Sequence, residues 1–165
     1  MTNWVEVGRK LRPVIQYRTE AKGVEKLDAY ANLFDLAGLN ETGRKLHQAR
    51  ADIDRNLQNL LHHMGALAVE EAVKQERGMV GHGRSGYVPT GNLMRSIDQH
   101  DDDGVTQVYP DATASDGETE YGGFVETGTR WHPESTPYMA QANATLQKRT
   151  QEELDGLAKF VFGGE

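Results

Sequence analysis

The chain has 165 residues, and its 25 acidic and 18 basic side chains give a formal net charge of −7. This acidity argues against a protein that holds nucleic acid by its phosphates, because such affinity comes from clustered lysine and arginine. The lack of cysteine excludes disulfides, thiolate-bound zinc and thiol catalysis, and we expect a single domain over 1–165, without signal peptide or membrane span, made in the cytoplasm.

The N-terminal region predicts one strand followed by a short helix. Residues 1–23 are an N-terminal strand segment, because polar and apolar side chains alternate loosely from 13 to 21 and Gly23 ends the pattern. Residues 24–77 are the helical part. Its first helix spans 24–37 and ends at Gly38, with an apolar stripe formed by Leu27, Tyr30, Ala31, Phe34 and Ala37.

A second, long helix is predicted from about 43 to 75, with Thr42 as its cap. Its second half is apolar over a wide arc, so residues 60–73 should form the centre of the core. Gly65 costs helix stability, which suggests a close crossing of another element there. The first half carries only a narrow stripe that includes Ile53 and Leu57. We therefore expect it to project and to contact a neighbouring molecule.

Residues 78–89 form a predicted flexible, glycine-rich loop that includes Arg84, a further interface candidate. Thr90 is expected to cap a short helix through Ile97, whose inward pair is Leu93 and Ile97. Residues 98–103 then read as a surface turn. Strands are predicted at 105–109 and within 111–115, with a hairpin signal at 116–117.

The segment from 121 to 126 fits either a strand or one helical turn. Glu126 is expected to be partly buried, paired either with Arg130 or with backbone N–H groups of the turn at 127–130. Gly128 should take a positive φ, and Trp131 should cover the resulting corner. Thr136 is then a predicted cap, with Pro137 in the first position of the last helix.

Several patterns that suggest ligand sites fail on their spacing. The glycines of 81–86 fit a dinucleotide pattern but follow a helix where a strand is required. The acidic run 101–103 does not fit a calcium loop, and the six histidines include no HExxH pair. We therefore expect no catalytic residue, metal or cofactor.

Two segments, in this order, resemble the tail-completion or minor tail-component proteins of the head-to-tail joining region of long-tailed bacteriophages. The first is a Thr-Gly-x-Leu-x-x-Ser-Ile segment, and the second is a Tyr-x-x-x-Val-Glu-x-Gly-Thr-Arg segment that leads through a Pro-aromatic pair into the final helix. The residues that carry the resemblance are Thr90, Gly91, Leu93, Ser96, Ile97, Tyr121, Phe124, Val125, Glu126, Gly128, Thr129, Arg130, Pro137 and Tyr138.

The expected fold is α+β: a small antiparallel sheet packed on a long helix, with short helices and a C-terminal helix. Residues 90–165 are expected to form the motif-bearing sheet and the C-terminal helix. The resemblance implies a structural virion protein of the phage neck, present as a homo-oligomeric ring beside a head-closure protein and a tail terminator or tube. Genome DNA would pass nearby without sequence-specific binding, and no membrane is involved. Two alternatives remain open: a metal-assisted hydrolase using Glu126, His132 and Asp101–Asp103, and a binding module with 78–89 as a lid.

Overall fold

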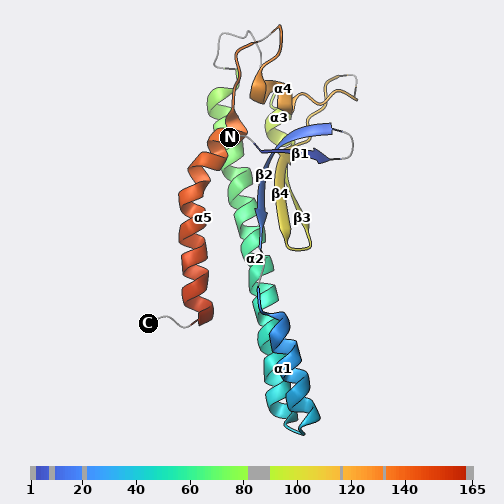
Figure 1. The fold of residues 1–165 in the computed structure, drawn as a ribbon. Helices are drawn as coiled ribbons and strands as arrows, with labels where there is room; N and C mark the ends of the chain where they lie inside the picture. Colours follow the sequence, from blue (N-terminus) through green and yellow to red (C-terminus); the bar gives the residue numbers. More distant parts are fainter. Residues whose placement is uncertain are drawn as a thin grey trace.

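The fold was examined in a computed structural model that describes residues 3–7, 10–19, 22–81, 90–115, 117–131 and 133–162. Arg84, Asp116 and His132 lie outside these residues, as does most of the predicted 78–89 loop. The fold is α+β, with the long helix α2 between the sheet and the C-terminal helix α5 (Figure 1). The elements are β1 Asn3–Val7, β2 Lys10–Arg18, α1 Glu25–Leu36, α2 Asn40–Met79, α3 Asn92–Arg95, β3 Ile97–Asp102, β4 Val105–Pro110, α4 Gly122–Thr127 and α5 Tyr138–Phe162.

The sheet is antiparallel throughout, in the order β1-β2-β4-β3. Its three-stranded part joins β2, β4 and β3, with Ile15 opposite Val108 and Gln99 opposite Val108 from the other side. The first half of β2 pairs instead with β1. The predicted N-terminal strand is thus confirmed as β2, although it begins and ends three residues earlier than expected.

Two predictions about the second half of the sheet are wrong. The surface turn expected at 98–103 is the edge strand β3, and the chain reverses only at Gly104, which has a φ of 66°. The strand expected within 111–115 is reduced to one bridge between Thr113 and Glu120. The acidic side chains of this segment favoured the prediction of a turn. Charged residues are also common on edge strands, where they suppress pairing with other chains.

The core forms where the second half of α2 meets the sheet and α5, as predicted for 60–73. Buried side chains from α2 include Leu60, Met64 and Leu67, and α5 contributes Met139 and Leu146. The short helix α3 ends at Arg95, so Ile97 is the first residue of β3, but Leu93 and Ile97 do face inward, with 1% and 5% exposed. No described helix has an apolar stretch long enough to cross a membrane.

Gly65 is the point at which α2 comes closest to the sheet. A Cβ atom at this position would overlap the amide of Gln99 and lie 2.6 Å from the methyl carbon of Thr106. Both residues belong to neighbouring strands, β3 and β4. The close crossing suspected from the sequence is therefore confirmed, and glycine is needed here for space, since α2 is helical at this residue.

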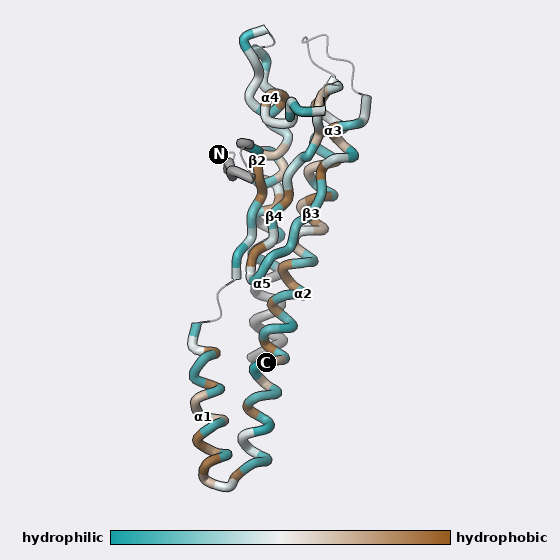
Figure 2. Tube along the Cα trace, turned by 90° about the vertical axis from the view of Figure 1, so that its right-hand side faces the viewer, coloured by the Kyte–Doolittle hydropathy of each residue, from teal (hydrophilic) through white to brown (hydrophobic). Residues whose placement is uncertain are grey.

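The first half of α2 extends beyond the sheet and pairs with α1 as a helical hairpin (Figures 1 and 2). Ile53 and Leu57 are half-buried. The cap prediction for Thr42 is wrong, because α2 begins at Asn40 and no side-chain hydrogen bond caps it among the described residues. The predicted stripe of α1 is also partly wrong: Ala31 is buried, whereas Tyr30 is 56% exposed.

We predict that Gly65→Ala lowers the free energy of unfolding by about 1–3 kcal/mol, because the new methyl group overpacks the contact with Gln99 and Thr106. The matched control is Gly78→Ala in the same helix, where a Cβ atom meets nothing within 4 Å. Without a clash, alanine should leave stability unchanged or raise it by up to about 1 kcal/mol. Urea unfolding followed by circular dichroism measures both, and equal effects at the two glycines would contradict the close crossing.

Candidate functional site

The first of the two motif segments turns the chain from the long helix region into β3. Gly91 has a φ of 73°, a left-handed conformation that favours glycine, and a Cβ atom there would lie 2.9 Å from Nη1 of Arg95. Thr90 Oγ1 accepts a hydrogen bond from the backbone N–H of Asn92 at 3.4 Å, but the cap prediction for Thr90 is wrong, because Gly91 is the residue that precedes α3 and no side chain among the described residues caps this helix. Ser96 Oγ donates to the carbonyl oxygen of Leu93 at 2.7 Å and closes the turn.

The second segment forms the short helix α4, which resolves the choice between strand and helical turn. A Cβ atom on Gly122 would lie 2.7 Å from the ring of Pro110, so this glycine lets α4 pack directly on the end of β4. Gly128 ends α4 with φ 78° and ψ 171°, a region open almost only to glycine, which confirms the predicted positive φ. Trp131 does not cover the corner as expected: it is 81% exposed, with the Arg130 guanidinium 5.5 Å from its ring centroid.

Glu126 is the buried acid of this region, with only 2% of its surface exposed. Its Oε2 accepts the backbone N–H of Met139 at 2.9 Å, and its Oε1 accepts that of Ala140 at 3.0 Å. Both N–H groups belong to the first turn of α5, where backbone N–H groups have no acceptor within the helix. Of the two predicted kinds of partner, backbone N–H groups are observed, but they belong to α5 and not to the turn. At this end of α5 the carboxylate also complements the positive end of the helix dipole.

This contact replaces the cap predicted at Thr136. The backbone N–H of Thr136 donates to the carbonyl oxygen of Val125 at 2.9 Å, and Pro137 accepts the first helical bond from Gln141 at 3.0 Å. Tyr138, the first residue of α5, is fully buried. The Pro-aromatic pair therefore fixes the entry of α5 into the core while Glu126 supplies the capping oxygens.

A partly buried ion pair braces the segment that precedes α4. Arg12 on β2 donates to Glu120 through Nε at 2.8 Å and through Nη2 at 2.5 Å, and both side chains are 11% exposed. The hydrogen bond with Glu120 raises the pKa of the Arg12 guanidinium, which also lies 4.9 Å from the ring centroid of Tyr109. A two-pronged contact of this kind fixes orientation as well as distance. Sequence reasoning missed it, because 108 residues separate the partners.

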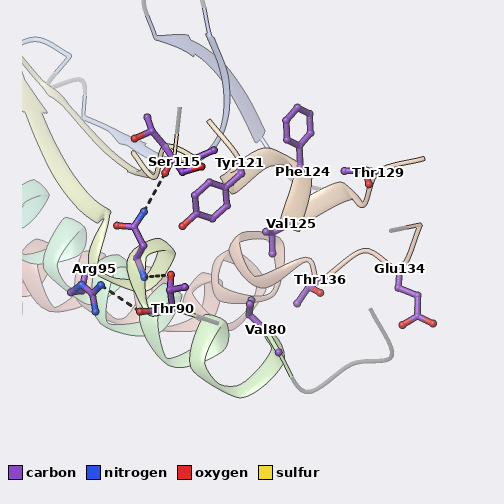
Figure 3. Close-up of a pocket in the computed structure, with 14 residues that line it drawn as sticks. Val80, Thr90, Arg95, Ser115, Tyr121, Phe124, Val125, Thr129, Glu134 and Thr136 are labelled. Carbon is purple, nitrogen blue, oxygen red and sulfur yellow. Dashed lines mark hydrogen bonds between the residues drawn. The ribbon is translucent and has the colours of Figure 1, made fainter. Parts of the chain in front are cut away.

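The two segments meet around a cavity of about 730 Å³. Figure 3 shows Val80, Tyr121 and Val125 around its middle, with Arg95 and Glu134 toward its two ends. The surface of its walls is mostly apolar, although eight of the fourteen lining residues carry polar or charged side chains, and such a mixture is found in binding pockets. The other lining residues are Gly81, Thr90, Asn92, Thr113, Ala114, Ser115, Phe124, Thr129 and Thr136. The sequence did not predict this cavity.

A buried carboxyl group that the sequence analysis missed lies near the end of α2. Glu76 is 4% exposed, and this burial raises the pKa of its carboxyl group, although the nearby charge of Arg77 acts in the opposite direction. Its helical spacing from Ala72 and Ala68, both fully buried, was the available signal for a buried position. The burial of Glu76 thus disfavours the ionised form of its carboxyl group.

The residues proposed for a metal-assisted hydrolase are not brought together in the described part of the chain. Asp101 lies near the β3–β4 turn and Glu126 lies in α4, at opposite ends of the sheet (Figure 1). Burial raises the pKa of Asp101, but hydrogen bonds from Gln99, His62 and Thr106 outweigh it and hold the pKa below its ordinary value. Among the residues that the structure describes, no cluster of three or more metal-binding side chains occurs.

Comparison with family models, with curated proteins and with solved structures gave no match to this chain.

We predict that Glu126→Gln lowers the free energy of unfolding by about 1–3 kcal/mol. The amide keeps one acceptor oxygen but directs an NH₂ group at a buried backbone N–H, which leaves that donor unpaired. Glu41→Gln is the control, because Glu41 is 73% exposed and its pair with Lys45 lies on the surface. That change should cost less than about 0.5 kcal/mol. Thermal unfolding of both variants tests the cap, and equal losses would contradict it.

We predict that Glu76→Gln stabilises the protein at pH 7 and that the gain shrinks as the pH falls toward 4.5, the ordinary pKa of the group. With its pKa raised in the folded state, Glu76 keeps its proton where the unfolded chain has lost it. Stability therefore falls as the pH rises from the unfolded to the folded pKa. Glutamine carries no charge at either pH. Melting temperatures at pH 7 and pH 4.5 measure the difference, and a pH-independent effect would refute the assignment.

Proposed function

We propose that this protein is a structural component of a bacteriophage neck, where it helps to join the tail to the head. The observation that carries the proposal is the pair of segments around Thr90–Ile97 and Tyr121–Arg130, present in order and similar to those of tail-completion proteins. In the fold, their distinctive residues serve as turn glycines, buried apolar anchors and a helix cap. Such roles suit a protein that works by shape, without turnover.

The shape and charge of the subunit support the same role. Large apolar side chains are exposed at both ends: Leu36 is 86% exposed on the α1–α2 hairpin, and Trp131 is 81% exposed beside α4. Surfaces of this kind mark contacts with other proteins. The net charge of −7 suits a part that lines a DNA path without gripping phosphates.

The proposed partners are further copies in a ring, a head-closure protein on one side and a tail terminator or tube on the other. Ile53 and Leu57 remain proposed contact positions, since they are half-buried on the part of α2 that projects beyond the sheet. The proposed location is the virion neck, with the host cytoplasm before assembly. DNA would pass without sequence-specific contacts, and no membrane is involved.

A soluble binding module is a second candidate, favoured by the cavity between the two motif segments. It differs from the first in its genetic outcome, because a binding module would not be required for particle assembly. A hydrolase has no comparable support within the described residues.

We predict that deleting the gene from a phage that encodes it yields filled heads and tails that do not join, or tails with faulty ends, because a neck component is missing. Electron microscopy of the lysate and plaque counts measure the outcome. A plasmid copy of the intact gene is the control and should restore infectious particles. Normal particles without any copy would overturn the neck role.

A further inference from the structure

The side of α1 that is turned toward α2 combines apolar and acidic residues: Ala31 is buried, and Leu27, Asp28 and Phe34 are half-buried. Two acidic side chains of α1 contact α2: Asp28 forms an ion pair with Arg50, and His47 approaches Asp28 at 3.2 Å and Asp35 at 3.7 Å. The two helices meet closely at Gly43, where a Cβ atom would lie 2.9 Å from the carbonyl oxygen of Ala31. Apolar burial, this close approach and the polar pairs together hold α1 in place.

A second set of apolar side chains of α1 lies on its outer face. Tyr30, Leu33 and Leu36 are 56%, 61% and 86% exposed, and they follow one another at three-residue spacing. Exposed alanines at 29 and 37 extend the same face. We call this surface, made of Ala29, Tyr30, Leu33, Leu36 and Ala37, the outer α1 face. Figure 2 shows hydrophobic colour along α1 within the hairpin.

We infer that the outer α1 face binds the same face of a second copy of this chain, with the two α1 helices antiparallel. The face is apolar from Ala29 to Ala37, so it can pack against a copy of itself, and two hairpins joined in this way form a four-helix bundle. If the twofold axis passes between Tyr30 and Leu33, each Tyr30 lies against Leu33 of the other copy. The pairing does not depend on the proposed neck role.

The charges at the two ends of the face favour the antiparallel arrangement. Lys26 lies at the N-terminal end of the outer α1 face and is exposed. The C-terminal end of α1 carries the negative end of the helix dipole and has no basic residue in its last turn. An antiparallel pair brings Lys26 of each copy to the C-terminal end of the other, beside Ala37. A parallel pair would place the two lysines together.

The size of the contact predicts a weak pair. The helix has 12 residues and is therefore about 18 Å long, and stable interfaces usually bury about 1,600 Å² in total. One pair of short helices covers less than this. We therefore expect association that depends strongly on protein concentration.

The first test compares Leu33→Asp with Asn32→Asp in sedimentation equilibrium over a concentration series. Both residues are exposed on α1, and both changes add one negative charge, but only Leu33 lies on the outer α1 face. We expect Leu33→Asp to raise the dimer dissociation constant at least about tenfold, and Asn32→Asp to change it less than about twofold. Circular dichroism should show that both variants stay folded. A chain that is monomeric throughout, or equal effects of the two changes, would overturn the inference.

The second test fixes the orientation and uses the absence of native cysteine. Lys26→Cys and Ala37→Cys proteins are mixed under mild oxidation. The antiparallel pair predicts mixed disulfides between the two variants in excess of those within each. Disulfides formed mainly by Lys26→Cys with itself would indicate a parallel pair and overturn the arrangement. If the pair forms as expected but deletion of the gene leaves the phage particles normal, the neck role is refuted and the pairing stands.

Discussion

The length of α2 sets the arrangement of everything else. Its 40 residues span about 60 Å, whereas strands of six residues cover about 20 Å of it. The sheet can therefore bury only one half of the helix. That half also receives α5 on the opposite side and becomes the core, and Gly65 lets the sheet approach closely enough to fill it. The other half must find a separate partner, and α1 provides it.

Polar groups fix the geometry at the end of the molecule where the motif segments meet. Glu126 ties α4 to the first turn of α5, and Arg12 ties β2 to Glu120 just before α4. Both contacts are largely buried, so each holds only if its partners stay in place, since an unpaired charge there costs several kcal/mol. The two contacts lie on either side of Tyr121, Phe124 and Val125, which line the cavity.

Local patterns predicted much of this fold, and they failed where distant residues decide. The long periodic stripe gave α2, and the requirement for positive φ gave the turn at Gly128. Glu126 was predicted as a buried acid, but its donors lie 13 and 14 residues further on in another helix, and no spacing rule connects them. The strand β3 was missed because its acidic residues read as a turn. The cavity combines several separate segments, so no sequence pattern predicted it.

The outward face of α1 shows a limit of periodicity itself. The spacing of Tyr30 and Ala31 places both near one stripe, yet one is exposed and the other fully buried. Periodicity tells which residues share a face but not which neighbour that face meets. Here Ala31 opposite Gly43 and the pairs of Asp28 already hold α1 on α2. The exposed Leu33 and Leu36 are thus not needed to keep α1 on α2. Exposed apolar side chains are a liability in a lone subunit, so their presence favours a partner that covers them.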